Sequence, residues 1–276
     1  MDLLIGHEGM LGRAWKQVLE RKETPFVAVS RPDFDLTSSA SLERITDGTY
    51  RRVINCAAWT DVDGAEDEEE RATEVNGHAV GRLARRCASA GSVLVHYSTD
   101  YVFDGQASEP YAVDAEYDPI NAYGRSKAVG EAAVREAGEQ HLILRTSWLY
   151  APWGNNFVLT MRRLGAQRDA LNVVDDQRGR PTSAQHLADA SYRLLEAGAR
   201  GTLHVTDGGE CTWYDLAKAV VETVNPRCDV QPCSSDAFPR PAKRPAYSVM
   251  DLGPTEALIG TMPDWRANVA AVLAQA

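Results

Sequence analysis

The sequence has little of several features that would place it in other classes of protein. No run of Lys or Arg is longer than two or three residues and the net charge is −10, so binding to nucleic acid or to an anionic membrane is not expected. No apolar stretch is long enough to cross a bilayer, and the chain starts with a strand-like run rather than a basic segment. We therefore expect neither a transmembrane helix nor a signal peptide.

Cysteine is also scarce, and its spacing matches no known framework. Two of the five cysteines are close in sequence but too far apart for a Cys-x-x-Cys clip, and no histidine cluster accompanies them. We therefore expect reduced thiols, no zinc site and a cytoplasmic location. The cysteines are Cys56, Cys87, Cys211, Cys228 and Cys233.

The composition is that of an ordinary globular protein. Of the 276 residues, 44% are hydrophobic and 25% are charged, which suits a folded chain with a substantial core. The length fits one cofactor-binding domain with a smaller lobe. No long linker, internal repeat or low-complexity tract interrupts it.

The first glycines of the chain stand where a dinucleotide site begins. A strand of the buried type over residues 3–5 leads into a Gly-x-x-Gly-x-x-Gly segment and then into a helix with one apolar side. Glycines at this spacing permit a tight turn, close approach of a pyrophosphate and close packing of helix on strand, while the helix N-terminus offers amide donors. We expect these residues at the cofactor: Gly6, Gly9, Met10, Leu11 and Gly12.

The end of the second strand bears on the choice of cofactor. This apolar strand ends at Ser30 and Arg31. An arginine here suits the 2′-phosphate of NADPH, whereas an acid suits the free hydroxyl of NADH. The sequence therefore favours NADPH, although Asp33 and Asp35 keep NADH open. Asp35 and Leu36 are expected to line the adenine side.

The third strand ends in small residues. Ala57 and Ala58 would let a cofactor pass close to the backbone. The carboxylates of Asp61 and Asp63 follow, and paired carboxylates can bind a metal. Because no further ligand accompanies them in the sequence, we expect no metal site.

Three residues further along suggest the reduction of a carbonyl group. Tyr123 and Lys127 are four residues apart in a helical run, so both lie on one helix face. A nearby ammonium stabilises a phenolate, which makes the pair a general acid. The apolar strand over residues 93–97 ends near Thr99, whose hydroxyl could hydrogen-bond a substrate carbonyl. Each motif alone also fits a plain surface helix or strand end, but together they are more specific.

With these motifs the chain resembles the dTDP-4-dehydrorhamnose reductases of the extended short-chain dehydrogenase/reductase superfamily. The glycine segment and the Thr, Tyr and Lys triad are shared by the whole superfamily, whereas other segments are more particular to this branch. The segments particular to this branch are Ser98-Thr99-Asp100-Tyr101-Val102-Phe103, Arg145-Thr146-Ser147-Trp148 and Arg244-Pro245-x-x-Ser248. The similarity also includes Tyr123-Gly124-x-Ser126-Lys127-x-x-Gly130-Glu131, Asn156-Phe157 and Gln177-x-Gly179-x-Pro181-Thr182.

The strand and helix pattern and the resemblance predict the same α/β fold. We expect a Rossmann-type, doubly wound parallel sheet with a smaller C-terminal substrate-binding lobe. The NAD(P)-binding domain would comprise residues 1–150, with return strands from about 171–205. Residues 151–170 and 206–276 would form the lobe that binds a sugar nucleotide.

The resemblance also implies roles in the transfer of a hydride from the nicotinamide to C4 of a dTDP-4-keto-6-deoxy-L-hexose. Tyr123 would donate the proton, Lys127 would hold the nicotinamide ribose, and Thr99 would polarise the ketone. Further residues would contact the substrate: Asp100, Tyr101 and Trp148 the sugar, and Asn156 and Arg244 the nucleotide side.

The metal site and the oligomeric state of the proteins that this chain resembles cannot simply be transferred to it. Some reductases of the family dimerise through magnesium held by acids, one of them on the first helix, but here that helix begins Arg13-Ala14-Trp15-Lys16. We therefore carry over no metal and expect a monomer or a homodimer.

The alternative functions fall into three groups. A sugar-nucleotide dehydratase would carry a glutamate after Asp100, where this chain has Tyr101, whereas a 4-epimerase would share the triad but hold NAD tightly. A 4-ketoreductase of a natural-product deoxysugar pathway would use identical chemistry. A non-catalytic NADP-binding regulatory subunit, such as that of methionine adenosyltransferase, also resembles these reductases.

Overall fold

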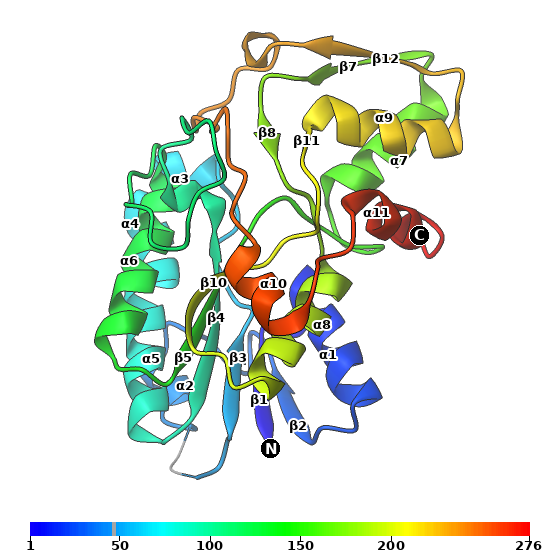
Figure 1. Ribbon diagram of the computed structural model, residues 1–276. Helices are drawn as coiled ribbons and strands as arrows, with labels where there is room; N and C mark the ends of the chain where they lie inside the picture. Colours follow the sequence, from blue (N-terminus) through cyan, green and yellow to red (C-terminus); the bar gives the residue numbers. More distant parts are fainter. Residues whose placement is uncertain (46–47) are drawn as a thin grey trace.

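A six-stranded parallel sheet forms the centre of the computed structural model, which describes residues 1–45 and 48–276 (Figure 1). The strand order is β10-β5-β4-β3-β1-β2, so the order reverses between β1 and β3. In a parallel sheet, ligands bind beyond the carboxyl ends of the strands at such a reversal. The strands are β1 (Asp2–Ile5), β2 (Phe26–Val29), β3 (Arg52–Asn55), β4 (Val93–Thr99), β5 (His141–Thr146) and β10 (Gly201–His204).

Helices cover both faces of the sheet, which confirms the doubly wound fold (Figure 1). On one face, α1 (Met10–Arg21) and α8 (Ala184–Glu196) pack on Leu4 and Ile54. On the other, α5 (Ala79–Ser89) and α6 (Ala122–Glu136) pack on Leu3. Successive side chains of a strand point to opposite faces, so a strand covered on both faces has to be apolar throughout.

The smaller lobe has a hydrophobic core of its own and lies beyond the carboxyl ends of the sheet strands (Figure 1). Three helices and a two-stranded parallel sheet form it. These elements are α7 (Phe157–Gln167), β7 (Ala170–Val174), α9 (Trp213–Val224), β12 (Asp229–Cys233) and α11 (Trp265–Leu273).

The structure divides the segment that the sequence suggested as return strands. Gly201–His204 joins the central sheet beside β5 as β10, as expected. In contrast, Ala170–Val174 pairs with β12 in the lobe, where Leu171 and Val173 are buried in the lobe core. The lobe therefore includes this strand, because its apolar face is covered by α7 and α9 rather than by the sheet.

Short elements complete the chain. They are α2 (Ser39–Leu42), α3 (Gly64–Asp67), α4 (Glu69–Thr73), the π-helix η1 (Glu74–His78), the 3₁₀-helices η2 (Asp100–Val102) and η3 (Ser235–Ala237), β6 (Leu149–Tyr150), β8 (Arg178–Gly179), β9 (Thr182–Ser183), β11 (Cys211–Thr212) and α10 (Gly253–Ile259). Within the described ranges, no helix has the length and apolarity needed to span a bilayer.

Candidate active site

A cavity of about 1140 Å³ lies between the carboxyl ends of the central strands and the smaller lobe. It extends from the glycine segment after β1, past the ends of β3 and β4, to aromatic residues of the lobe. Sixteen of the residues expected at a site line it: Gly6, Gly9, Met10, Leu11, Ser30, Arg31, Asp35, Leu36, Ala57, Ala58, Thr99, Asp100, Tyr101, Tyr123, Lys127 and Trp148. Three others, Gly12, Asn156 and Arg244, do not line it.

The glycine segment leaves space that any larger residue would fill. Gly6 has a φ of +81°, and a Cβ there would lie 2.8 Å from the amide nitrogen of Ala57 at the end of β3. A Cβ on Gly12 would lie 2.1 Å from the carbonyl oxygen of Gly6, so Gly12 shapes the turn through close packing. Helix α1 begins next to Gly9 without a side-chain cap, which leaves its first amides to an anion. This arrangement fits the pyrophosphate of a dinucleotide.

The far end of the cavity bears on the cofactor's 2′-position. The Asp35 carboxylate accepts hydrogen bonds from the Thr37 amide at 2.8 Å and from the Thr37 hydroxyl at 2.7 Å. These bonds lower the pKa of Asp35 and occupy its Oδ1. Ser30 and Arg31 line the same end, and the buried Ser30 hydroxyl has no hydrogen-bond partner among the described residues. These donors fit a 2′-phosphate better than a free hydroxyl.

Helix α6 carries Tyr123 and Lys127 to the cavity. The helix starts where the Asn121 side chain accepts a hydrogen bond from the Gly124 amide at 2.7 Å. The Lys127 side chain is buried, and its Nζ donates to the Tyr97 carbonyl of β4 at 2.6 Å. Burial lowers the pKa of Lys127 to about 8, and Glu131 opposes this effect. The side chain therefore remains mainly a cation at neutral pH.

Tyr123 lies in a site that keeps its phenol protonated. Burial raises its pKa, the Asp100 charge raises it further, and the Thr99 hydroxyl opposes both. The Tyr101 ring meets the Tyr123 ring edge-on, with centroids 5.9 Å apart. Lys127 is one helical turn away on the same helix, and a buried neutral phenol can give a proton to an acceptor in the cavity.

Thr99 and Asp100 form a coupled pair at the end of β4. The Thr99 hydroxyl donates to Asp100 Oδ1 at 3.0 Å and accepts from the Tyr101 amide at 3.2 Å. Burial raises the pKa of Asp100 to about 6, and the hydroxyls of Ser248 and Thr99 oppose this effect. The carboxyl group therefore titrates close to the working range of an enzyme.

Two tryptophans form the lobe side of the cavity. Trp148 has a φ of +48°, which is unusual for a residue with a large side chain. Its ring stacks on Trp213 with centroids 3.7 Å apart, and Trp213 Nε1 donates to Gln177 Oε1 at 3.1 Å. Strained backbone often occurs at functional sites. Trp213 could not be predicted at the site, because it begins a helix that is 65 positions further along the chain.

Asn156 and Arg244 do not line the cavity themselves, and both already have partners within the protein. Asn156 Oδ1 accepts from the Leu159 amide at 3.0 Å and so caps α7, and its Nδ2 donates to the Ala151 carbonyl at 3.0 Å. Arg244 forms an ion pair with Asp63 at 3.0 Å. Their contact with the nucleotide stays a prediction, and it would require Arg244 to exchange or share this partner.

Asn76 does not line the cavity but supports a loop that does, and no sequence pattern pointed to it. It is buried in the π-helix η1, and its side chain bonds both the amide and the carbonyl of Trp59, at 2.9 and 3.1 Å. It also donates to the Ser126 hydroxyl at 3.0 Å. Asn76 thus joins a loop of the cavity wall to the helix that carries Tyr123 and Lys127. A π-helix often marks such a site, but no residue pattern announced this one.

The described part of the chain shows no group of three or more His, Cys, Asp or Glu side chains that could hold a metal. Of the two carboxylates considered for this role, Asp61 accepts a hydrogen bond from the Gly64 amide at 2.9 Å. The other, Asp63, binds Arg244. Both carboxylates therefore have partners within the protein.

Comparisons with known proteins show the family of this chain. A family model described as the RmlD substrate binding domain matches residues 1–276. The dTDP-4-dehydrorhamnose reductase of Mycobacterium tuberculosis is 41% identical over 283 residues, which cover 99% of this chain and 92% of the relative. The dTDP-4-keto-6-deoxy-D-glucose reductase of Streptomyces niveus is 42% identical over 252 residues, which cover 90% of this chain and 87% of the relative.

Solved structures are similar over the whole chain. A dTDP-4-dehydrorhamnose reductase from Clostridium acetobutylicum has a TM-score of 0.94 and 37% identity, and the match covers 99% of both chains. A dTDP-4-dehydrorhamnose reductase from Bacillus anthracis, solved in complex with NADP, has a TM-score of 0.94 and 34% identity. That match covers 100% of this chain and 99% of the other.

Proposed function

We propose that this chain, which belongs to the dTDP-4-dehydrorhamnose reductase family, uses NADPH to reduce the C4 ketone of dTDP-4-dehydro-6-deoxy-L-hexose to dTDP-L-rhamnose. The observation that carries the proposal is the convergence of Thr99, Tyr123 and Lys127 on a cavity that starts at the glycine segment. The Bacillus anthracis structure in complex with NADP supports the choice of cofactor. So do Arg31 and the occupied Asp35 carboxylate at the far end of the cavity.

The chemistry follows from the protonation states of the site. NADPH, when bound, supplies the hydride that forms the new C–H bond at C4. Tyr123 gives its phenolic proton to the ketone oxygen, and the Lys127 cation stabilises the phenolate that remains. The Thr99 hydroxyl would polarise the ketone, while Lys127 would also hold the nicotinamide ribose. General acid catalysis of this kind contributes about 10²–10⁴-fold to the rate.

The smaller lobe supplies the substrate side of the proposed site. Trp148, on its left-handed backbone, would face the sugar together with Asp100 and Tyr101, all of which line the cavity. Asn156 and Arg244 would serve the nucleotide side. This proposal makes the lobe a sugar-nucleotide-binding unit on a cofactor-binding sheet. It includes a cytoplasmic location and a monomer or a homodimer, which gel filtration would distinguish.

The test measures the oxidation of NADPH and of NADH with dTDP-4-keto-6-deoxyglucose, with and without a 3,5-epimerase. The loss of absorbance of the reduced cofactor reports the rate. Oxidation that requires the epimerase would identify the L-sugar ketone as the substrate. No oxidation under either condition would refute the proposed reaction. A rate with NADH above that with NADPH would refute the proposed cofactor preference.

A second candidate is a 4-ketoreductase for another nucleotide-linked deoxysugar. The similarity to the Streptomyces niveus dTDP-4-keto-6-deoxy-D-glucose reductase favours it, because that relative is as close in sequence as the rhamnose-forming ones. Its chemistry at Tyr123 and Lys127 would be identical, and only the sugar would differ. Oxidation of NADPH without the epimerase would support this candidate.

A further inference from the structure

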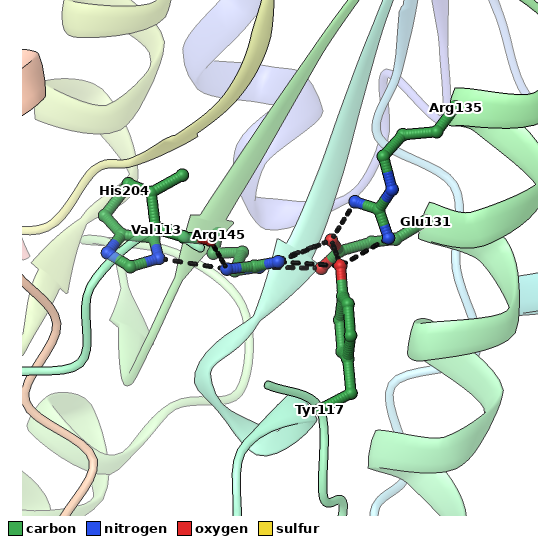
Figure 2. Close-up of polar contacts among 6 residues, drawn as sticks. All are labelled: Val113, Tyr117, Glu131, Arg135, Arg145 and His204. Atoms are coloured by element: carbon green, nitrogen blue, oxygen red, sulfur yellow. Dashed lines mark hydrogen bonds and ion pairs between the residues drawn. The ribbon is translucent and has the colours of Figure 1, made fainter. Parts of the chain in front are cut away.

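A group of polar side chains, with Glu131 and Arg145 buried at its centre, connects α6 to β5, and the mechanism above does not use it (Figure 2). We name it the Glu131 cluster. Glu131 follows Lys127 by one turn of α6, and its side chain is fully buried. The cluster consists of Tyr117, Glu131, Arg135, Arg145 and His204.

Arg145 on β5 connects the members of the cluster. Its Nε donates to Glu131 Oε1 at 3.0 Å and its Nη2 donates to Glu131 Oε2 at 3.0 Å, which is a two-pronged contact. Its Nη1 donates to the Val113 carbonyl at 2.8 Å, and its Nη2 also donates to the Tyr117 hydroxyl at 2.7 Å. Arg145 therefore fixes both α6 and the loop that leads into it.

Glu131 is ionised and His204 is neutral in this cluster. Burial alone would raise the pKa of Glu131, but the hydrogen bonds and charge of Arg145 outweigh it and lower the pKa. Burial and Arg145 lower the pKa of His204 to about 4, so this ring stays neutral and adds no charge. Its Nδ1 faces the Asp251 carbonyl at 3.0 Å, which leaves Nε2 to accept from Arg145.

Lys127 has little else to compensate its charge. On β4, the Tyr97 carbonyl accepts one of its hydrogen bonds, and His96 on the same strand is kept neutral because burial and the Lys127 charge lower its pKa. Asp100 also lines the cavity, but the pKa of Lys127 is shifted by the charge of Glu131 and not by that of Asp100. Glu131 is the carboxylate whose charge acts against the desolvation of the Lys127 ammonium. Residues four apart on a helix are close enough for this effect.

The free energy of the ion pair by itself is a weak reason for its presence. A buried ion pair contributes little to stability, and apolar residues of similar volume often replace it without loss. The Arg145 and Glu131 side chains are 2% and 0% exposed, so their desolvation is nearly complete. A pair this deep under the catalytic helix needs another advantage, and the neighbouring Lys127 supplies one.

We infer that Glu131, fixed by Arg145, is a positioning residue for Lys127, which it holds at the cavity as a cation. This inference rests on the proposed reductase function. Without the negative charge of Glu131, the Lys127 ammonium loses its proton at a lower pH. The fall of kcat/KM on the alkaline side of the pH profile therefore shifts to a lower pH. Tyr123 then donates its proton without a cation to stabilise the phenolate.

The test compares the double variant Glu131→Met/Arg145→Met with the wild type and with Glu136→Gln. The double variant removes both charges and leaves neither partner buried alone, whereas Glu131→Gln would leave Arg145 unpaired. Glu136 is exposed on the same helix, so its substitution controls for the loss of one solvated charge. Circular dichroism and thermal unfolding establish that each variant folds.

The measurements are kcat/KM for the keto sugar and the dissociation constant of NADPH, both between pH 6 and pH 9. For the double variant we expect kcat/KM about fivefold below wild type at pH 8 and nearly equal at pH 6, as for a Lys127 pKa lowered by about one unit. Binding of NADPH should weaken over the same pH range. Glu136→Gln should follow the wild type.

Each remaining outcome is decisive. A double variant that folds and keeps the wild-type pH profile overturns the inference, as does one that fails to fold, because the cluster would then serve folding alone. If the wild type does not reduce the keto sugar, the proposed function fails. The pH dependence of NADPH binding by the wild type and the double variant then tests, without any turnover, whether Glu131 keeps Lys127 charged.

Discussion

Replacing Asp100 by asparagine is expected to stabilise the protein at pH 8, although Asp100 lies in the proposed active site. Its side chain is 3% exposed, and burial raises its pKa from 3.8 to about 6. A difference of one pKa unit corresponds to about 1.4 kcal/mol, so ionisation of Asp100 costs the folded state about 3 kcal/mol. An asparagine avoids this cost and keeps an oxygen that can accept from Thr99.

The pH dependence follows from the direction of the shift. Because the folded state holds this proton more tightly, the penalty is absent below pH 4, grows between pH 4 and pH 6, and is constant above. The free energy of unfolding of Asp100→Asn should therefore be about 2–3 kcal/mol above that of the wild type at pH 8 and equal to it at pH 4. Urea unfolding of the protein without ligands at the two pH values measures this difference.

The control for this prediction has the opposite sign. The Tyr111 hydroxyl and the Gln106 amide lower the pKa of Asp104, so its ionised form stabilises the folded state above the unfolded pKa. Asp104→Asn should therefore lose stability at pH 8 and not at low pH. The reasoning is refuted if Asp100→Asn is no more stable than the wild type at pH 8, or if its gain persists at pH 4.

Three further predictions concern catalysis and binding. Tyr123→Phe should lower kcat by about 10²–10⁴-fold while NADPH affinity stays nearly unchanged, and a variant that keeps most of its rate would exclude this proton donor. Gly12→Ala should abolish NADPH binding in a fluorescence titration, because its methyl group would lie 2.1 Å from a carbonyl oxygen, whereas the matched Gly9→Ala, with 3.5 Å, should keep measurable affinity. Trp213→Ala removes the ring that supports Trp148, so KM for the keto sugar should rise about tenfold or more. An unchanged KM would show that the two rings do not contribute to sugar binding.

The cavity residues that could be predicted from the sequence are those whose placement depends on the spacing of neighbouring residues in the chain. The glycine segment works through a tight turn and a helix start, and both are set within seven residues. Likewise, Tyr123 and Lys127 share a helix face because they are four positions apart. The ends of β1, β3 and β4 could be placed together because parallel strands deliver their carboxyl ends to one edge.

The parts that sequence could not predict depend on contacts between distant segments. Asn76 reaches Trp59 and Ser126 only because a π-helix turns it inward. The two tryptophans of the lobe stack because Trp148 adopts a left-handed backbone. The placement of β7 in the lobe was also out of reach, because its partner β12 lies more than fifty residues away.

The chain order of most strands and helices, the glycine segment after the first strand and the shared helix face of Tyr123 and Lys127 could all be predicted from the sequence. They follow from periodicity and spacing, which are properties of neighbouring residues. The charge states could not be predicted in this way, because they depend on burial and on partners from other elements. Glu131 is one of the residues in the recognised segment, but its pairing with Arg145 on β5 and its effect on Lys127 exist only once helix and sheet are packed together.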